Sequence, residues 1–106
     1  MFKFLDTVQV SQFSKSIKTS ELSKSGRGYN TVRRAIKVRN EKPDTLYRVI
    51  AKTTFREGVI DYDADFITFI HEQAVQVYIV ADRLSRRYYA VAEDMTLCAK
   101  GVDVDA

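Results

Sequence analysis

The sequence is poor in the residues that build covalent or metal-centred sites. It has one cysteine, Cys98, and one histidine, His71, among 106 residues. A single cysteine excludes a disulfide within the chain and argues against a small secreted scaffold, so Cys98 is expected to be a small buried apolar residue. No nucleophile elbow, phosphate-binding loop or paired metal-ligand spacing is found. We therefore expect a non-catalytic protein with no cofactor and no metal.

Long hydrophobic runs are also missing. No segment approaches the roughly 18 consecutive apolar residues of a membrane helix, so no membrane partner is expected. The first residues, MFKFLDTVQVSQF, carry Asp6 where a signal peptide needs an unbroken apolar core. We expect this segment to be part of the fold and the protein to be cytoplasmic.

Size and composition are those of one small soluble domain covering residues 1–106. Hydrophobic residues make up 45% of the chain and charged residues 29%, which are ordinary values for a globular protein. A chain of this length buries enough surface to fold without disulfides or metals. No internal repeat and no linker divides it.

Charge is distributed unevenly along the chain. Residues 1–52 contain twelve basic and four acidic residues, a net +8, and the remainder has a net −5. Such asymmetry suggests a partner for the basic half, either nucleic acid or an acidic protein surface, or self-association of opposite halves in a homo-oligomer. The alternative is that folding mixes the two halves into a surface without a patch.

The first 25 residues favour a helical element. Their apolar residues recur at spacings of three to five, and the serine-rich stretch that follows looks like a frayed helix end. Gly26 or Gly28 would supply the left-handed stop. The apolar positions are Phe2, Leu5, Val8, Phe13, Ile17 and Leu22.

Residues 29–92 predict a mainly antiparallel sheet of about five strands. Apolar and polar residues alternate through 30–55, and the only proline, Pro43, lies between two alternating runs, which is typical of a β-hairpin. Alternation resumes at 75–79, "RLSRR" predicts a turn and "YYAVA" a short strand. Residues 93–106 form a tail that is either a short helix or an edge strand. The predicted fold class is α+β, with the N-terminal helical element packed on the sheet.

The most basic stretch is residues 25–40, SGRGYNTVRRAIKVRN, which has five basic residues and no acid. On a strand, Arg33, Lys37 and Arg39 would project from one face and could follow a phosphate backbone, while Tyr29 and Tyr47 could stack on bases. Neighbouring cations would widen the positive field. The candidate nucleic-acid-binding residues are Lys24, Arg27, Tyr29, Arg33, Arg34, Lys37, Arg39, Tyr47 and Arg48.

Residues 20–37, SELSKSGRGYNTVRRAIK, also resemble the helix-turn-helix pattern of DNA-binding proteins. The resemblance implies that Asn30 caps a recognition helix whose Val32, Ala35 and Ile36 face inward. Arg33, Arg34 and Lys37 would then face the major groove. The strand and the recognition helix remain alternatives, and both assign the basic residues to nucleic acid.

Two further motifs, DYDAD and His71, are weaker candidates for a metal or catalytic site. Three aspartates alternate in DYDAD, residues 61–65, but Phe66 occupies the place where a calcium loop needs glycine, so an acidic loop is the better interpretation. His71 lies beside Glu72 at an apparent hairpin tip, where general acid–base work requires a pocket that the sequence does not indicate.

Three function classes follow. The leading hypothesis is a small nucleic-acid-binding protein that uses a basic strand or hairpin, with DNA and RNA not distinguished. The second is a protein-interaction module, either an adaptor or inhibitor of an acidic partner or a charge-polar homo-oligomer. The third is a small nuclease or RNA-cleaving toxin that uses arginines and His71.

Overall fold

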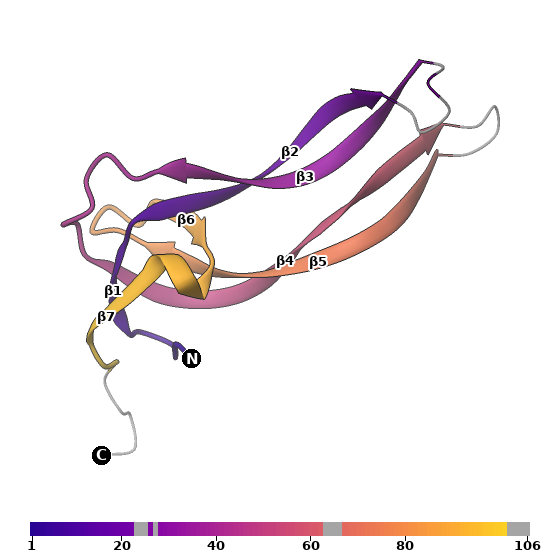
Figure 1. Cartoon of the computed structure of the whole chain (residues 1–106). Helices are drawn as coiled ribbons and strands as arrows, with labels where there is room; N and C mark the ends of the chain where they lie inside the picture. Colours follow the sequence, from indigo (N-terminus) through magenta and orange to yellow (C-terminus); the bar gives the residue numbers. More distant parts are fainter. Residues whose placement is uncertain (23–25, 27, 63–66, 102–106) are drawn as a thin grey trace. The chain divides into compact units, whose positions relative to one another are not determined.

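The protein is an all-β chain in the computed structural model (Figure 1), which describes residues 1–22, 26, 28–62 and 67–101. No α-helix occurs among these residues, so the α+β prediction is wrong. Neither do they contain a helix long and apolar enough to cross a membrane. The elements are β1 (Thr7–Val10), β2 (Gln12–Leu22), β3 (Tyr29–Arg39), β4 (Tyr47–Tyr62), β5 (Ile67–Ala81), β6 (Arg87–Ala90), the 3-10 turn η1 (Ala92–Asp94) and β7 (Met95–Ala99).

The predicted N-terminal helix is replaced by β1 and β2. Phe13 and Ile17 are four residues apart, a spacing that one face of a strand satisfies as well as one face of a helix. The burial pattern distinguishes the two. Half-buried and exposed positions alternate from Ile17 to Leu22, which is the period of a strand and not of a helix. In β1, Val8 and Val10 are fully buried on one face.

The chain divides into two compact units. Unit 1 consists of Met1–Lys15, Lys37–Thr53 and Gln76–Ala106, and unit 2 consists of Ser16–Ile36 and Thr54–Val75. Four strands, β2 to β5, contribute residues to both units, so each unit combines segments from the basic and acidic halves of the sequence.

Unit 1 contains the main hydrophobic core. β1 pairs antiparallel with β4 and with β7, and β5 pairs antiparallel with β6. Alternate residues of these strands point inward, which is why period-two stretches such as VQV and YIV bury their valines. Phe2, Phe13 and Tyr88 pack against the cluster from its edge. The core residues are Val8, Val10, Tyr47, Val49, Tyr78, Val80, Ala90 and Met95.

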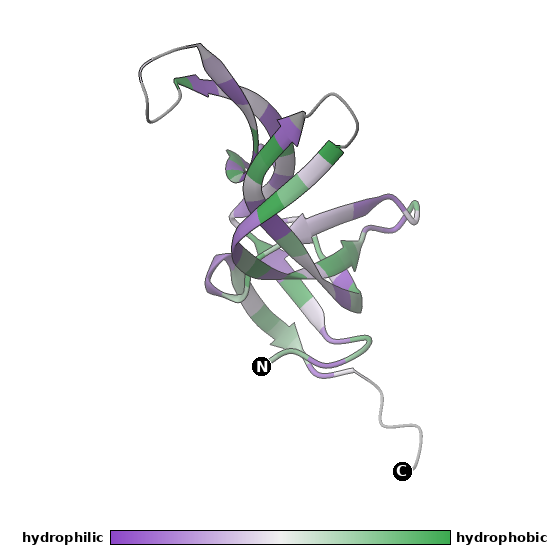
Figure 2. Cartoon of the chain, turned by 90° about the vertical axis from the view of Figure 1, so that its right-hand side faces the viewer, coloured by the Kyte–Doolittle hydropathy of each residue, from purple (hydrophilic) through white to green (hydrophobic). Residues whose placement is uncertain are grey.

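Unit 2 is built from parts of β2, β3, β4 and β5. β3 pairs antiparallel with β4, with Val32 opposite Val59 and Arg33 opposite Gly58. β2 is hydrogen-bonded to β3, and β5 to β4. Hydrophobic and hydrophilic residues both occur along the strands of the sheet (Figure 2). Val32 is fully buried in this unit, at 1% exposed.

The structure decides between the two interpretations of the basic stretch. Residues Tyr29–Arg39 form a strand, so the recognition helix implied by the helix-turn-helix resemblance is wrong. The predicted antiparallel hairpin is confirmed, because β3 and β4 flank the turn that contains Pro43. Gly26 and Gly28 do adopt left-handed backbone, with φ of 73° and 78°, although no helix precedes them.

Several local predictions are also settled. The turn before "YYAVA" and its strand are confirmed: Ser85 has a φ of 62°, and β6 follows. The ambiguous tail contains an edge strand, because β7 pairs with β1. His71 is not at a hairpin tip but inside β5, and Cys98 is exposed instead of buried.

Candidate functional site

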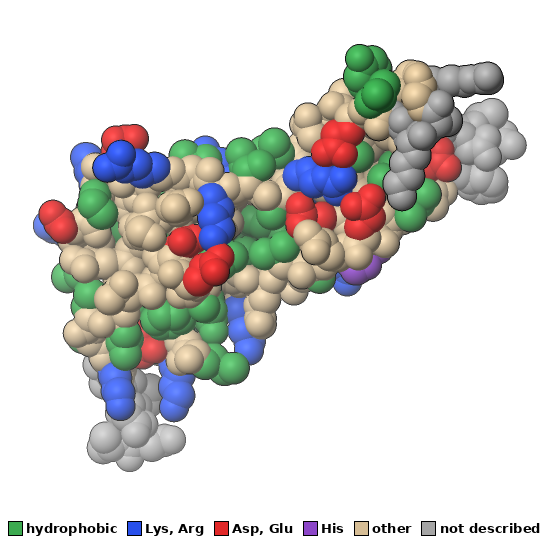
Figure 3. Space-filling model, in the orientation of Figure 1, with side chains coloured by type: hydrophobic (Ala, Val, Ile, Leu, Met, Phe, Trp, Pro, Cys, Tyr) green, Lys and Arg blue, Asp and Glu red, His purple; other side chains and the backbone are tan. Residues whose placement is uncertain are grey.

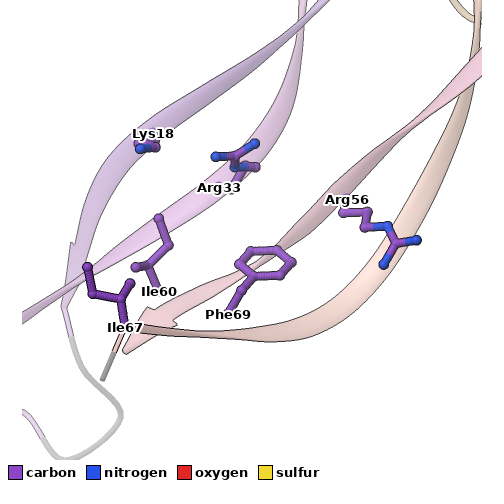
Figure 4. A pocket seen from close by; sticks show the side chains of 6 residues that line it. All are labelled: Lys18, Arg33, Arg56, Ile60, Ile67 and Phe69. Carbon is purple, nitrogen blue, oxygen red and sulfur yellow. The ribbon is translucent and has the colours of Figure 1, made fainter. Parts of the chain in front are cut away.

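Three basic side chains from three strands of unit 2 line a single pocket of about 440 Å³, the basic pocket. Lys18 comes from β2, Arg33 from β3 and Arg56 from β4 (Figure 4). The other described lining residues are apolar, and no acidic residue of the described part of the chain belongs to the lining. The lining residues are Lys18, Arg33, Arg56, Ile60, Ile67 and Phe69.

The register of β3 and β4 explains why these side chains share one face. Arg33 lies directly opposite Gly58, and directly paired residues of an antiparallel sheet point to the same side. Arg56 and Ile60 are two residues from Gly58 in either direction, so they project to this side as well. Because Gly58 has no side chain, space remains between them.

The ring of Phe69 occupies part of that space. A Cβ atom built on Gly58 would lie 2.9 Å from Cζ of Phe69 and 2.2 Å from the carbonyl oxygen of Ile70. The β5 backbone therefore approaches β4 at Gly58 more closely than any other residue type would allow. Phe69 stays 37% exposed, so part of its ring is accessible beside the three cations.

The three pocket cations have no acidic partner among the residues that the structure describes. No carboxylate of the described residues lies within ion-pair distance of Lys18, Arg33 or Arg56. Positive charges without nearby counter-charges attract anions, most strongly where apolar walls reduce the screening by water. The basic pocket can therefore bind an anion that also carries an apolar portion.

Arg34, the next residue along β3, is arranged differently. Its side chain projects from the opposite face of the strand and donates to Glu21 at 2.9 Å and 3.1 Å and to Glu72 at 3.0 Å. Hydrogen bonding to Glu21, and then to Glu72, raises the pKa of the Arg34 guanidinium. Two carboxylates already occupy its donors, which leaves little for a phosphate.

Lys37 is also engaged within the protein. Its ammonium group forms ion pairs with Glu93 and with Asp94, the latter at 3.0 Å. Hydrogen bonds to Glu93, and then to Asp94, raise the pKa of Lys37. All three residues belong to unit 1. The ion pairs of Lys37 therefore help to hold η1 against the start of the segment Lys37–Thr53.

Tyr47 lies in the core of unit 1 and is 5% exposed. Its ring makes edge contacts with Phe13 and Tyr88, with both centroid distances at 5.7 Å. The hydroxyl accepts a hydrogen bond from Asn40 Nδ2 at 3.4 Å, and burial raises the pKa of Tyr47. A ring enclosed in this way has no free face to stack on a base.

The remaining predicted site residues are exposed or lie outside the described residues. Tyr29 is 74% exposed in unit 2, and Arg39 and Arg48 are exposed in unit 1. No acidic side chain in the described part of the chain forms an ion pair with either arginine. Lys24 and Arg27 fall outside the described residues.

The described residues of the motifs considered for catalysis or metal binding are not assembled into a site. His71 and Asp61 are both exposed, and residues 63–65 of the DYDAD motif lie outside the described residues. Within residues 1–22, 26, 28–62 and 67–101, no group of three His, Cys, Asp or Glu side chains is placed to hold a metal ion.

Lys18, Arg56 and Phe69 were not singled out from the sequence. Residues 56–58 look like a break between elements, yet they lie in the middle of β4. The signal that could have placed Arg56 is the alternation of Arg56, Gly58 and Ile60, which continues the period-two pattern of "YRVIAKTTF".

Folding mixes the charges of the two halves. Counted over the sequence, unit 1 contains eleven basic and eight acidic residues, and unit 2 contains six of each. On the face shown in Figure 3, Lys and Arg side chains stand beside Asp and Glu side chains. Any anion-binding surface of unit 2 must therefore be local, as the basic pocket is.

Comparison of this chain with protein-family models, curated proteins and solved structures finds no match.

Proposed function

We propose that this protein is a small non-catalytic nucleic-acid-binding protein that captures phosphates at the basic pocket of unit 2. The observation that carries the proposal is that Lys18, Arg33 and Arg56 line one pocket to which no acidic residue of the described part of the chain contributes. Arginine donors in pairs suit phosphate oxygens, and lysine adds a point charge. Arg33 is thus the member of the predicted set on which the function depends.

The other predicted residues differ in whether their side chains are free to contact a phosphate. Arg39 and Arg48 are exposed and available as further phosphate contacts on unit 1. Arg34 and Lys37 are held by carboxylates, and Tyr47 is buried, so the proposal does not use them. Tyr29 is exposed at the start of β3 but does not line the basic pocket, so the proposal does not use it either.

Phosphate capture predicts a weak, salt-dependent interaction. Non-specific binding to nucleic acid has dissociation constants of about 10⁻⁴ to 10⁻⁶ M at physiological salt. The salt dependence of this affinity increases with the number of phosphates that the protein neutralises. Three uncompensated cations are enough for binding at low salt. They are too few to resist competition at high salt.

Fluorescence anisotropy with labelled single- and double-stranded DNA and RNA, at low and near-physiological salt, tests the proposal. Arg33→Gln is expected to weaken binding about tenfold, since a hydrogen-bonded charged contact contributes about 1.5–3 kcal/mol. Arg34→Gln is the matched control, because the same residue type one position along is already paired with Glu21 and Glu72. Absence of binding at low salt would refute the proposal.

A protein-interaction module is the second candidate, and exposed apolar side chains of unit 2 favour it. Tyr29 and Ile67 are 74% and 75% exposed, and Leu22 and Ile70 are 63% and 51% exposed. Side chains of this kind are more typical of an interface than of a surface that faces only water. Sedimentation velocity over a range of concentrations tests the homo-oligomer form: a constant sedimentation coefficient would exclude it.

The proposal places the protein in the cytoplasm, where the exposed thiol of Cys98 would remain reduced. It also treats the protein as non-catalytic. The nuclease alternative has a direct test: the oligonucleotides recovered from the binding experiment should be intact, and cleavage that is lost in His71→Ala would favour an enzyme instead.

A further inference from the structure

We propose that the basic pocket takes one unpaired base together with its neighbouring phosphate, so that the protein prefers single-stranded to double-stranded nucleic acid. This inference rests on the proposed function and specifies its ligand. The pocket has two chemically distinct parts, because Lys18, Arg33 and Arg56 supply cations while Ile60, Ile67 and Phe69 supply apolar surface.

The apolar part has no role in phosphate capture alone. A phosphate is fully hydrated and gains nothing from contact with isoleucine or phenylalanine, whereas a base is planar and apolar on both faces. Ile67 is 75% exposed and Phe69 37% exposed, so both have surface left to cover. A ligand that fills the pocket combines a negative group with an apolar one, and a nucleotide has both.

The position of Phe69 suits this ligand. The ring of Phe69 lies over Gly58, because a Cβ atom built on Gly58 would lie 2.9 Å from Cζ of Phe69. A side chain at residue 58 would therefore displace the ring. Arg33 is the cross-strand partner of Gly58, and Arg56 is two residues along β4, so the ring lies among the cations (Figure 4). A base resting on Phe69 would thus keep its own phosphate within reach of a guanidinium.

A duplex cannot use the pocket in this way. Its bases are paired and stacked, and turning one out requires that its pairing and stacking be broken. The volume of about 440 Å³ lies in the range of pockets that hold one small molecule, not a helix. Single strands are therefore the expected ligand.

Abasic oligonucleotides separate base recognition from phosphate capture. The full-length protein is titrated into a labelled thymidine or uridine 12-mer, whichever backbone it binds more tightly, and into an abasic strand of the same length, backbone and label. We expect the strand with bases to bind about tenfold more tightly, because a base that stacks on an aromatic ring stabilises the complex. A free nucleoside monophosphate added as competitor shows whether the pocket also takes the unlinked ligand.

Variants assign the effect to the pocket. Phe69→Leu keeps an apolar side chain and the fold but removes the ring, so the ratio between the two strands is expected to fall to about 2. Tyr29→Leu is the matched control, because Tyr29 is an exposed aromatic residue of unit 2 that does not line the pocket. Its ratio should equal that of the unmodified protein.

The outcomes are distinct. Equal binding of both strands by the unmodified protein overturns base insertion and leaves phosphate capture intact. A ratio that falls in Tyr29→Leu but not in Phe69→Leu also overturns it, because the base would then stack elsewhere. If neither strand binds even at low salt, the proposed function itself fails.

Discussion

Substitution of Gly58 by alanine tests the close approach of β4 and β5 that forms the basic pocket. Gly58 is not among the glycines with positive φ, so alanine meets no backbone conformational penalty there. The cost comes from contact, because the new Cβ would lie 2.2 Å from the carbonyl oxygen of Ile70 and 3.0 Å from its carbonyl carbon. Backbone atoms cannot rotate away, so the two strands must separate.

The magnitude follows from two opposing effects. Overpacking of this kind costs about 1–3 kcal/mol, and a clash with backbone belongs at the upper end of that range. Alanine restricts the unfolded chain and returns about 0.4–1 kcal/mol. We expect Gly58→Ala to lower the free energy of unfolding by about 2 kcal/mol, which corresponds to a fall in Tm of roughly 8–16 °C for a chain of this size.

Urea denaturation followed by far-ultraviolet circular dichroism measures this difference. Thr54→Ala, an exposed position on the same strand, is the control and should change stability by less than about 0.5 kcal/mol. Adding Phe69→Leu to Gly58→Ala should not restore stability, since the shortest contact is with backbone. A Gly58→Ala protein as stable as the Thr54→Ala protein would refute the described approach of the strands.

Two further predictions concern titrating groups of unit 1. The backbone N–H groups of Lys3 and Gly101 each donate to an Asp6 carboxylate oxygen at 2.8 Å, and these hydrogen bonds lower the pKa of Asp6. The stability that Asp6 contributes is therefore present above its ordinary pKa of about 4. It is lost as the pH falls through the lowered pKa of the folded protein. Asp6→Asn should unfold more easily at neutral pH, with a shallower loss of stability in acid; unchanged acid denaturation curves would contradict this. Burial raises the pKa of Tyr47, so the stability it confers is present below about pH 10 and is lost as pH rises through the raised folded pKa. Ultraviolet titration should show one late-ionising tyrosine that is missing in Tyr47→Phe.

Much of the sheet could be predicted from period-two alternation. The β3–β4 hairpin, the turn at Pro43 and the strand at "YYAVA" are visible in the sequence because one face of each strand is buried. The first 25 residues misled for a physical reason: a spacing of four residues fits a helix and a strand equally. Only the burial of alternate residues in β2 separates the two.

The roles of individual cations could not be predicted. Alternation correctly places Arg33 and Arg34 on opposite faces of one strand, but the carboxylate partners of Arg34 lie 13 and 38 residues away in sequence. The pairing of distant strands decides which arginine is neutralised. The burial of Tyr47 likewise depends on Phe13 and Tyr88, which reach it from other strands.

The charge asymmetry between the halves was also a poor guide to the surface. Strands β2 to β5 contribute to both units and bring acidic and basic segments together, so unit 2 has equal numbers of both. What survives is a local excess of positive charge in the basic pocket, which Lys18 of β2 and Arg56 of β4 line together with Arg33.

The salt dependence of single-strand binding tests the central claim most directly. Each neutralised phosphate adds about 0.7 to the slope of log K against log salt concentration, so a slope of about −2 is expected when Lys18, Arg33 and Arg56 each contact a phosphate of the strand, one of them beside the inserted base. Arg33→Gln should make the slope shallower by about 0.7, and Arg34→Gln should leave it unchanged. Equal slopes in these two variants, or a loss in Arg34→Gln alone, would contradict phosphate capture at the basic pocket.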